Sequence, residues 1–266
     1  MPIVTVHAPG TFNWPELATI DQSAAKKFYS SLFDWQFRDT DMGELGVYTI
    51  FTRDGVDVAA LYTLEPKMLE MGVPPNWGAY VTVENADEAA AKAKANGGTV
   101  LNEPFDVMEH GRMAVIKDPQ GAVFCVWQAK QSIGANVLGE PNSLGWVQLN
   151  AKDTAKAKAF YPAVVGWKVQ NDPMPAAMGG GEYTTWLKAD GPAGGMMAMP
   201  PGTEQAPSHW LSYFAVTDVD ATTAKALALG GQSYVPPTDI PGTGRFSVLA
   251  DGQGAAFALI KFSVPS

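Results

Sequence analysis

The chain carries one sequence unit twice, and this duplication restricts the folds open to it more than any other feature. The segment NWPELATIDQSAAKKFYSSLFDW, residues 13–35, returns as GWVQLNAKDTAKAKAFYPAVVGW, residues 145–167. Matched residues keep a nearly constant spacing of about 132 positions along both copies: Trp14 and Trp146, Trp77 and Trp210, Tyr80 and Tyr213, Asp118 and Asp251. Such a unit is as long as an ordinary domain, so the sequence predicts a duplicated domain.

The pattern within each copy predicts an α+β fold. Alternation of apolar and polar residues, helical spacing and turn residues predict the order strand, helix and three strands. Each copy contains this βαβββ unit twice. Asp21 is placed to cap the first helix. We expect modules at residues 11–130 and 142–264, a linker at 131–141, and a frayed arm over the first ten residues.

Composition limits the classes of function. Eighteen basic residues against 27 acidic ones give a net charge of −9, which opposes binding to nucleic acid or an anionic membrane, so neither partner is expected. No apolar run approaches the roughly 20 residues that span a bilayer. The N-terminal sequence lacks the pattern of a signal peptide, so we expect a cytoplasmic protein. The single cysteine, Cys125, excludes an internal disulfide and a thiolate zinc cluster.

Further motifs mark the units. An FY pair lies in the first helix of each copy, a Gly-Gly pair follows each second helix, and DPQG at residues 118–121 precedes the last strand of the first copy. With four βαβββ units, these motifs resemble the vicinal oxygen chelate superfamily, which includes glyoxalase I, extradiol dioxygenases and the fosfomycin- and bleomycin-resistance proteins. Within it, the chain is most similar to bacterial two-module glyoxalase-like proteins, over about residues 12–262.

The resemblance implies four βαβββ units that form two paired glyoxalase-like modules, each with a curved, cup-shaped mixed sheet. It also implies a monomer that contains an internal pseudo-dimer, or a homodimer of such chains. In the enzymes of the superfamily, His, Glu or Gln on the first, fifth and eighth strands hold a metal ion in the cup. Carried over to this chain, those positions are Trp14, Gly78 and Cys125 in the first copy and Trp146, Leu211 and Ala258 in the second. One thiol does not make a divalent-metal site, so we expect a metal-free protein without a cofactor.

Strand alternation predicts which side chains share the cup face with those positions. Glu16 and Gln148 lie two residues after the two tryptophans, and Arg112 and Arg245, at the start of the seventh strands, are candidates for an anionic ligand. The predicted ligand-binding set is Trp14, Glu16, Tyr80, Arg112, Cys125, Trp127, Trp146, Gln148, His209, Tyr213 and Arg245. This lining is aromatic with a few polar groups, as in many small-molecule sites.

Each candidate also has a structural interpretation. The tryptophans and tyrosines can be core residues, and His209 can be a solvated residue at a strand start. Glu16 is either a general base or the ion-pair partner of Arg112 or another cation. The two arginines can form structural salt bridges, and Cys125 is most simply an inert buried thiol.

Three functions remain open. The first is binding of a hydrophobic or aromatic small molecule, as in the bleomycin-resistance proteins. The second is a cofactor-independent isomerase, cyclase or lyase of natural-product metabolism, in which Glu16 or His209 moves a proton and Tyr80 or Tyr213 stabilises an oxyanion. The third is metal-dependent glyoxalase or dioxygenase chemistry through shifted ligands, Glu16, Gln148 and His209, which requires the copies to exchange strands.

Overall fold

The computed structural model describes residues 3–176, 179–200, 202–203 and 205–263. The first copy contains β1 (Phe12–Thr19), α1 (Gln22–Phe33), β2 (Gln36–Asp41), the short 3-10 helix η1 (Gly43–Leu45), β3 (Val47–Arg53), β4 (Val56–Thr63), α2 (Pro66–Glu70), β5 (Asn76–Thr82), α3 (Ala86–Ala95), β6 (Thr99–Val107), β7 (Gly111–Lys117) and β8 (Val123–Ala129). The second contains β9 (Ser143–Ala151), α4 (Thr154–Val165), β10 (Lys168–Pro173), β11 (Glu182–Lys188), β12 (Gly191–Ala198), β13 (His209–Ala215), α5 (Val219–Ala228), β14 (Gln232–Ile240), β15 (Gly244–Ala250) and β16 (Ala256–Phe262). The predicted α+β fold of four βαβββ units is confirmed. The sequence pattern did not predict the short helix α2.

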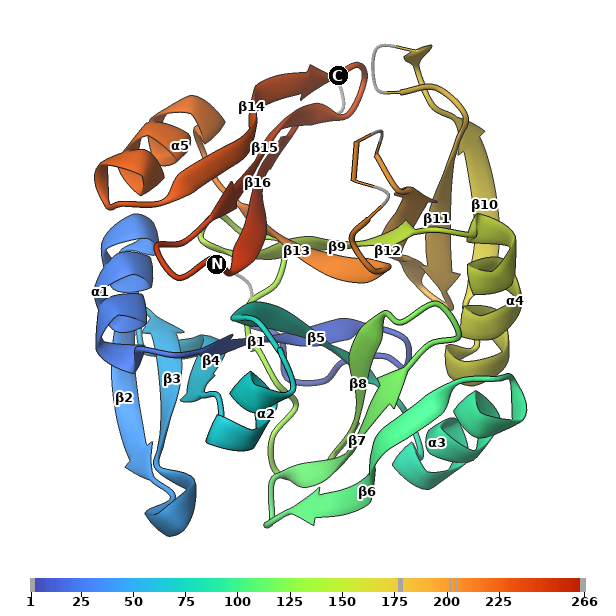
Figure 1. The fold of residues 1–266 in the computed structure, drawn as a ribbon, viewed down its shortest axis with the longest axis horizontal. Coiled ribbons are helices and arrows are strands. Elements are labelled where there is room, and N and C mark those ends of the chain that lie inside the picture. Colours follow the sequence, from blue (N-terminus) through green and yellow to red (C-terminus); the bar gives the residue numbers. More distant parts are fainter. Residues whose placement is uncertain (1–2, 177–178, 201, 204, 264–266) are drawn as a thin grey trace.

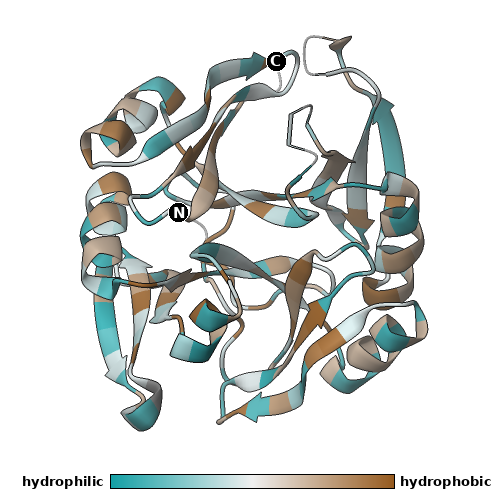
Figure 2. Cartoon of the chain, in the orientation of Figure 1, coloured by the Kyte–Doolittle hydropathy of each residue, from teal (hydrophilic) through white to brown (hydrophobic). Residues whose placement is uncertain are grey.

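Each copy forms its own mixed sheet. The strand orders are β2-β3-β4-β1-β5-β8-β7-β6 and β10-β11-β12-β9-β13-β16-β15-β14. Figure 1 shows the central strands of the two sheets across the middle of the molecule, with the arms of each sheet extending away from the other module and α2 between the arms of the first sheet. The outer strands β2 and β10 are largely hydrophilic in Figure 2, and all their residues are exposed.

No strand passes from one copy into the other sheet within the described residues. Glu16 therefore lies in the first sheet, whereas Gln148 and His209 lie in the second. The hypothesis of one shared metal site built from these three residues is wrong, because it requires exchanged strands.

Capping side chains begin the helices where the sequence predicts them. Asp21 accepts a hydrogen bond from the backbone nitrogen of Ala24 at 3.0 Å, and Asp153 accepts one from Lys156 at 3.1 Å. These carboxylates satisfy backbone donors that the first helical turn leaves unpaired.

Two large cores join the modules on the helix-covered faces of the sheets. One core combines the second half of the first module with the first half of the second, and it includes Phe124 and Trp186. The other combines the remaining halves. In it Tyr29 donates a hydrogen bond to Asp251 at 3.0 Å and accepts one from Trp77 at 3.0 Å.

The same arrangement occurs in the first core. Tyr161 donates to Asp118 at 3.0 Å and accepts from Trp210 at 3.1 Å. Each module therefore supplies a carboxylate to a tyrosine of the other module, in two related networks.

The N-terminal arm and the linker are packed rather than frayed. His7 is buried, and its Nε2 lies 2.7 Å from the carbonyl oxygen of Ala135. Ala135 and Val137 of the linker are fully buried. From residue 3 on, the expectation of a frayed arm is wrong, because the backbone of the arm pairs with the linker, as where the nitrogen of Val4 donates to Asn136 at 2.7 Å. Residues 1–2 lie outside the described residues.

The described residues include no helix that is both long and apolar enough to cross a membrane.

Candidate functional site

The first cup is organised around Glu16. On the central strand β1, Trp14 is paired with Tyr80 and Glu16 with Gly78, and Tyr80 in turn is paired with Cys125 on β8. The alternation of strand side chains puts Trp14, Glu16, Tyr80 and Cys125 on one face. The sequence-predicted residues of the first copy are thus brought together, apart from Arg112.

Two tyrosine hydroxyl groups hold the Glu16 carboxylate. Tyr48 donates to Oε1 at 2.6 Å and Tyr80 donates to Oε2 at 2.5 Å. The indole nitrogen of Trp14 donates to the Tyr48 oxygen at 3.2 Å. Burial raises the pKa of Glu16 above its usual value, although the two tyrosine hydrogen bonds oppose this shift.

Tyr48 is a functional candidate that sequence reasoning missed. It comes from β3, which is separated from β1 by β4 in the sheet. A signal was present, because Tyr48 and Tyr183 begin matched YT pairs in the two copies.

Apolar and aromatic side chains form the floor of the first cup. Tyr80, Met113, Cys125 and Trp127 are one buried cluster, with Trp14 packed against it. Burial, together with the nearby Glu16 charge, raises the pKa of the Cys125 thiol. The thiol is therefore protonated at neutral pH and has no nucleophilic character.

Part of the first cup is accessible to solvent. Trp14, Glu16, Tyr48 and Tyr62 are partly exposed, whereas the floor residues are at most 9% exposed. The Glu16 charge is close enough to contribute to a raised pKa of the Tyr62 hydroxyl. A separate open hollow of about 500 Å³ lies outside both cups, against α1 and β2.

The second cup keeps part of this arrangement and replaces the rest. Trp146 donates to the Tyr183 oxygen at 2.9 Å, as Trp14 does to Tyr48. Tyr183 donates to Oε1 of Gln148 at 3.1 Å, in place of the Glu16 carboxylate. The centre of the second cup is therefore a neutral amide.

From Gln148 a chain of hydrogen bonds leads to His209. The Gln148 amide donates to Asn150 at 3.0 Å, and the Asn150 amide lies 3.1 Å from Nε2 of His209. Nδ1 of His209 lies 2.9 Å from the carbonyl oxygen of Pro207. Because a carbonyl only accepts, Nδ1 donates to Pro207, and the Asn150 amide nitrogen faces Nε2.

Tyr213 corresponds to Tyr80 but has a different environment. It belongs to a buried cluster with Leu211, Phe246 and Ala258, and Trp146 packs against the same cluster. Among the described residues, the Tyr213 hydroxyl has no hydrogen-bond partner, since Gln148 is turned toward Asn150. The predicted residues of the second copy, apart from Arg245, thus share one face but not one network.

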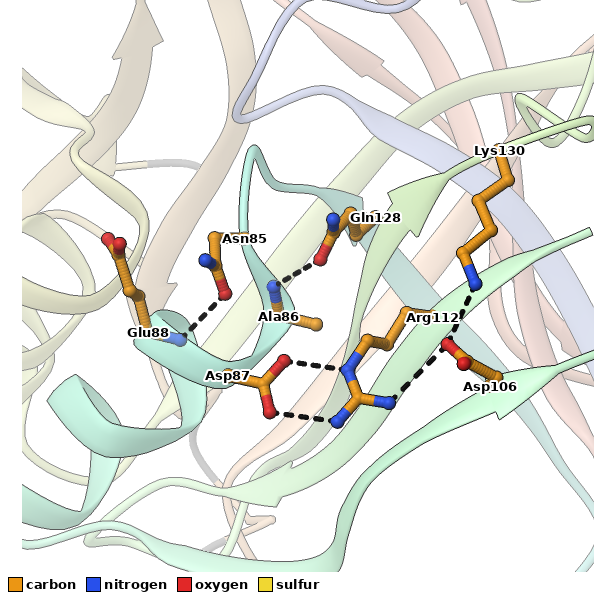
Figure 3. Close-up of polar contacts among 8 residues, drawn as sticks. All are labelled: Asn85, Ala86, Asp87, Glu88, Asp106, Arg112, Gln128 and Lys130. Carbon is orange, nitrogen blue, oxygen red and sulfur yellow. Dashed lines mark hydrogen bonds and ion pairs between the residues drawn. The ribbon is translucent and has the colours of Figure 1, made fainter.

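Arg112 and Arg245 lie on the opposite face from the cups. Figure 3 shows the Arg112 guanidinium against Asp87 of α3 and Asp106 of β6, with Nε 2.6 Å and Nη2 2.8 Å from the Asp87 oxygens. Arg245 makes the equivalent contacts to Asp220 and Asp239. On β7, Met113 faces the cup, so its neighbour Arg112 faces the helices.

Two predictions are therefore corrected. The arginines are not part of the cup lining, and Arg112 is not the partner of Glu16. The two arginines form ion pairs with Asp87 and Asp220, which lie in the first turns of α3 and α5. These are the structural salt bridges of the alternative interpretation.

The residues of the cups do not fit the metal ion that the fold implies. The positions of the expected ligands hold Trp14, Gly78 and a protonated Cys125 in the first cup, and Trp146, Leu211 and Ala258 in the second. The Glu16 oxygens accept from tyrosines instead. Over the described part of the chain, no three His, Cys, Asp or Glu side chains are grouped to hold a metal.

The sequence model of the Glyoxalase/Bleomycin resistance protein/Dioxygenase superfamily matches residues 11–126 and 143–259. The chain is 44% identical over 263 residues to CFP32 of Mycobacterium tuberculosis (strain CDC 1551 / Oshkosh), which has a provisional glyoxylase name, and 98% of each chain is covered. It is 35% identical over 268 residues to the anthracycline biosynthesis protein DnrV of Streptomyces peucetius, with 97% and 95% covered.

The structural comparison gives the fold. The Mn(II)-bound glyoxalase from Novosphingobium aromaticivorans matches with a TM-score of 0.62 at 16% identity, covering 95% of this chain and 82% of that one. At this identity the likeness supports the architecture and leaves the chemistry to the residues of this chain.

Proposed function

The chain belongs to the Glyoxalase/Bleomycin resistance protein/Dioxygenase superfamily, and from the cup residues we propose that it binds an aromatic small molecule in its first module without a metal ion. The observation that carries this proposal is the Glu16 carboxylate, held by the hydroxyls of Tyr48 and Tyr80 beside the indoles of Trp14 and Trp127. An apolar and aromatic surface with a few oriented polar groups is the usual construction of a small-molecule site.

One of the relatives, DnrV, supports the aromatic class of ligand. DnrV is named for anthracycline biosynthesis, and anthracyclines are compounds with fused aromatic rings. The cup offers such rings a flat partner, because indole and phenol groups stack favourably on aromatic ligands.

Ligand titration tests this proposal. The protein is titrated with a panel of polycyclic aromatic compounds, and binding is followed by the fluorescence of its eight tryptophans. We expect saturable quenching that weakens in Trp127→Leu, whose side chain lies in the first cup, and persists in Trp146→Leu of the second. A panel that leaves the fluorescence unchanged, or equal losses in both variants, would contradict a first-cup site.

Metal analysis tests the other half of the proposal. We expect less than stoichiometric metal by elemental mass spectrometry after incubation with zinc, nickel, iron or manganese. One tightly held ion per chain would contradict the metal-free assignment.

One observation favours an enzyme as the second candidate. Glu16 combines a raised pKa with a hydrogen-bonded tyrosine, Tyr80, so it is equipped to accept a proton from a bound carbon acid. Once Glu16 is protonated, the Tyr80 hydroxyl is released from it and can donate to the developing oxyanion. Returning that proton to another atom of the same ligand would complete an isomerisation without a cofactor. Loss of turnover in Glu16→Gln, with ligand affinity retained, would support this candidate over simple binding, and unchanged turnover would reject it.

A further inference from the structure

Glu16 is a carboxylate without a cationic partner. No lysine, arginine or histidine of the described residues forms an ion pair or hydrogen bond with it. The groups that surround it are Trp14, Tyr48, Tyr62, Tyr80 and Cys125, and each of them is neutral at neutral pH. A charge that is largely removed from water is costly unless it is paired, so this site favours a partner that the protein itself does not supply.

The other internal carboxylates show what a structural carboxylate looks like in this fold. Asp118 accepts hydrogen bonds from the backbone nitrogens of Gln120 and Ala122 and from the Tyr161 hydroxyl. Asp251 repeats this pattern in the second module. Both are almost fully buried, whereas Glu16 is partly exposed on the concave face.

Glu16 also has unused acceptor capacity. A carboxylate offers about four acceptor positions, and Glu16 receives two hydrogen bonds, both from tyrosines. The aromatic rings around it carry negative faces, which attract cations. A carboxylate among such rings is the chemistry that recognises an ammonium group.

The second cup serves as an internal control. Gln148 occupies the position of Glu16, receives a hydrogen bond from Tyr183, and donates to Asn150. Its neutral amide offers a cation no opposite charge. The two cups therefore differ in charge at the same point of the fold.

We propose that the first cup recognises a protonated amine carried on an aromatic ligand, with Glu16 as its counter-ion. This inference rests on the proposed binding function and names the ligand class for that same site. The second cup, centred on Gln148, discriminates against such a charge.

Three matched probes test the inference: 1-naphthylmethylamine, which is protonated at neutral pH, 1-naphthalenemethanol, its neutral analogue, and the 1-naphthylacetate anion. Calorimetric titration at pH 7.5 should show the amine binding about tenfold or more tightly than the alcohol, because a charge-assisted contact replaces a neutral one, and the anion binding most weakly. Glu16→Gln should abolish this preference.

Two control variants separate local from general effects. Glu84→Gln makes the same change in net charge at an exposed position outside the cup and should preserve the preference. Tyr80→Phe removes one hydrogen bond from Glu16 but leaves its charge, so both affinities can fall while the ratio of amine to alcohol affinity stays. This variant keeps the inference testable if Glu16→Gln folds poorly.

The possible outcomes distinguish the two proposals. Equal affinities for the amine and the alcohol, or a preference retained in Glu16→Gln, would overturn the amine inference while binding of the aromatic panel leaves the proposed function standing. Absence of binding by all three probes and by the panel would overturn both.

Discussion

The two cups are built on the same scaffold and differ where a ligand would meet them. Both keep a tryptophan that donates to a tyrosine, Trp14 to Tyr48 and Trp146 to Tyr183. That tyrosine donates to a carboxylate in the first cup and to the Gln148 amide in the second. A few changes on the concave face have thus given one duplicated fold a charged cup and a neutral cup.

On the helix-covered faces, in contrast, the two modules are alike. Tyr29 and Tyr161 each donate a hydrogen bond to a carboxylate of the other module and accept one from a tryptophan. Both rings are fully buried in cores that the modules share. A residue in these cores packs against both modules, whereas a cup residue contacts one.

The largest expected effect tests the shared cores. Tyr29→Ala and Tyr161→Ala should each lower the free energy of unfolding by about 3–5 kcal/mol, because each leaves a cavity in a close-packed core. Urea unfolding followed by far-UV circular dichroism and by tryptophan fluorescence should give one coincident transition in each variant.

Tyr29→Phe is the matched control. It keeps the ring and should cost less, about 1–3 kcal/mol, because Asp251 retains two backbone hydrogen bonds while the Trp77 indole nitrogen loses its acceptor. Separate transitions for the two modules would contradict the shared cores and confine each tyrosine to its own module.

Exchange of the central residues tests the cups themselves. Gln148→Glu should cost about 1–3 kcal/mol at pH 7.5, because it buries a charge and removes the donor to Asn150. Glu16→Gln should be neutral or stabilising in the absence of ligand, because it removes a charge without a cationic partner. Equal losses from both exchanges, measured by urea unfolding, would show that the cups do not differ electrostatically.

A smaller effect is expected on β12, the strand paired with β9 beside Gln148 in the second cup. Gly195 is paired with Gln148, and a Cβ at this position would collide with the Tyr183 hydroxyl. Gly195→Ala should therefore displace Tyr183 and cost about 1–2 kcal/mol. The first cup already has Ala60 at the matching position, so the steric restriction is specific to the second cup.

Differential scanning calorimetry checks this prediction. Ala60→Gly should cost about 1–2 kcal/mol, because it adds strand flexibility and removes a buried methyl group. An unchanged melting temperature in Gly195→Ala would mean that Tyr183 moves without loss and that its hydrogen bonds contribute little.

The pH dependence of the first cup follows from the raised pKa of Glu16. Between the unfolded-state pKa of about 4.3 and the higher folded-state pKa, the folded protein binds more protons at this residue than the unfolded chain does. Its contribution to stability is therefore most favourable in acid and is lost as the pH rises. Glu16→Gln lacks this contribution.

Urea unfolding between pH 4.5 and 8 measures the difference. The stability of Glu16→Gln relative to the unsubstituted protein should increase as the pH rises through the folded-state pKa and then become constant. A relative stability that decreases with pH would mean that the tyrosine hydrogen bonds outweigh burial and that the Glu16 pKa is lowered.

Local rules predicted much of this molecule. The duplication gave the four βαβββ units, and alternation along single strands correctly placed Trp14 with Glu16 and Cys125 with Trp127. Tyr48 was missed because it comes from a strand that is not adjacent to β1, and only the sheet order brings it to Glu16.

The errors share a physical cause. The arm and linker look irregular in sequence, but their backbone groups find partners in distant segments, as the Val4 nitrogen does at Asn136. Arg112 follows Gly111 at the start of a strand, where the face is set by pairing with β8 rather than by a local pattern. The packing of the arm and the face on which Arg112 lies are both set by pairing with distant segments. Periodicity along one segment does not predict such pairing.

The smallest expected effects concern these arginines. Arg112→Met and Arg245→Met remove exposed ion pairs, which contribute little and are screened by salt. Both variants should show a slight decrease in melting temperature that is similar in the two modules and disappears in high salt, and neither should change affinity for an aromatic ligand, because both side chains lie on the helix-covered face. Loss of ligand affinity in Arg112→Met alone would place that arginine in the first site. The two modules would then differ in function on the helix-covered face as well, where their arginines make equivalent contacts.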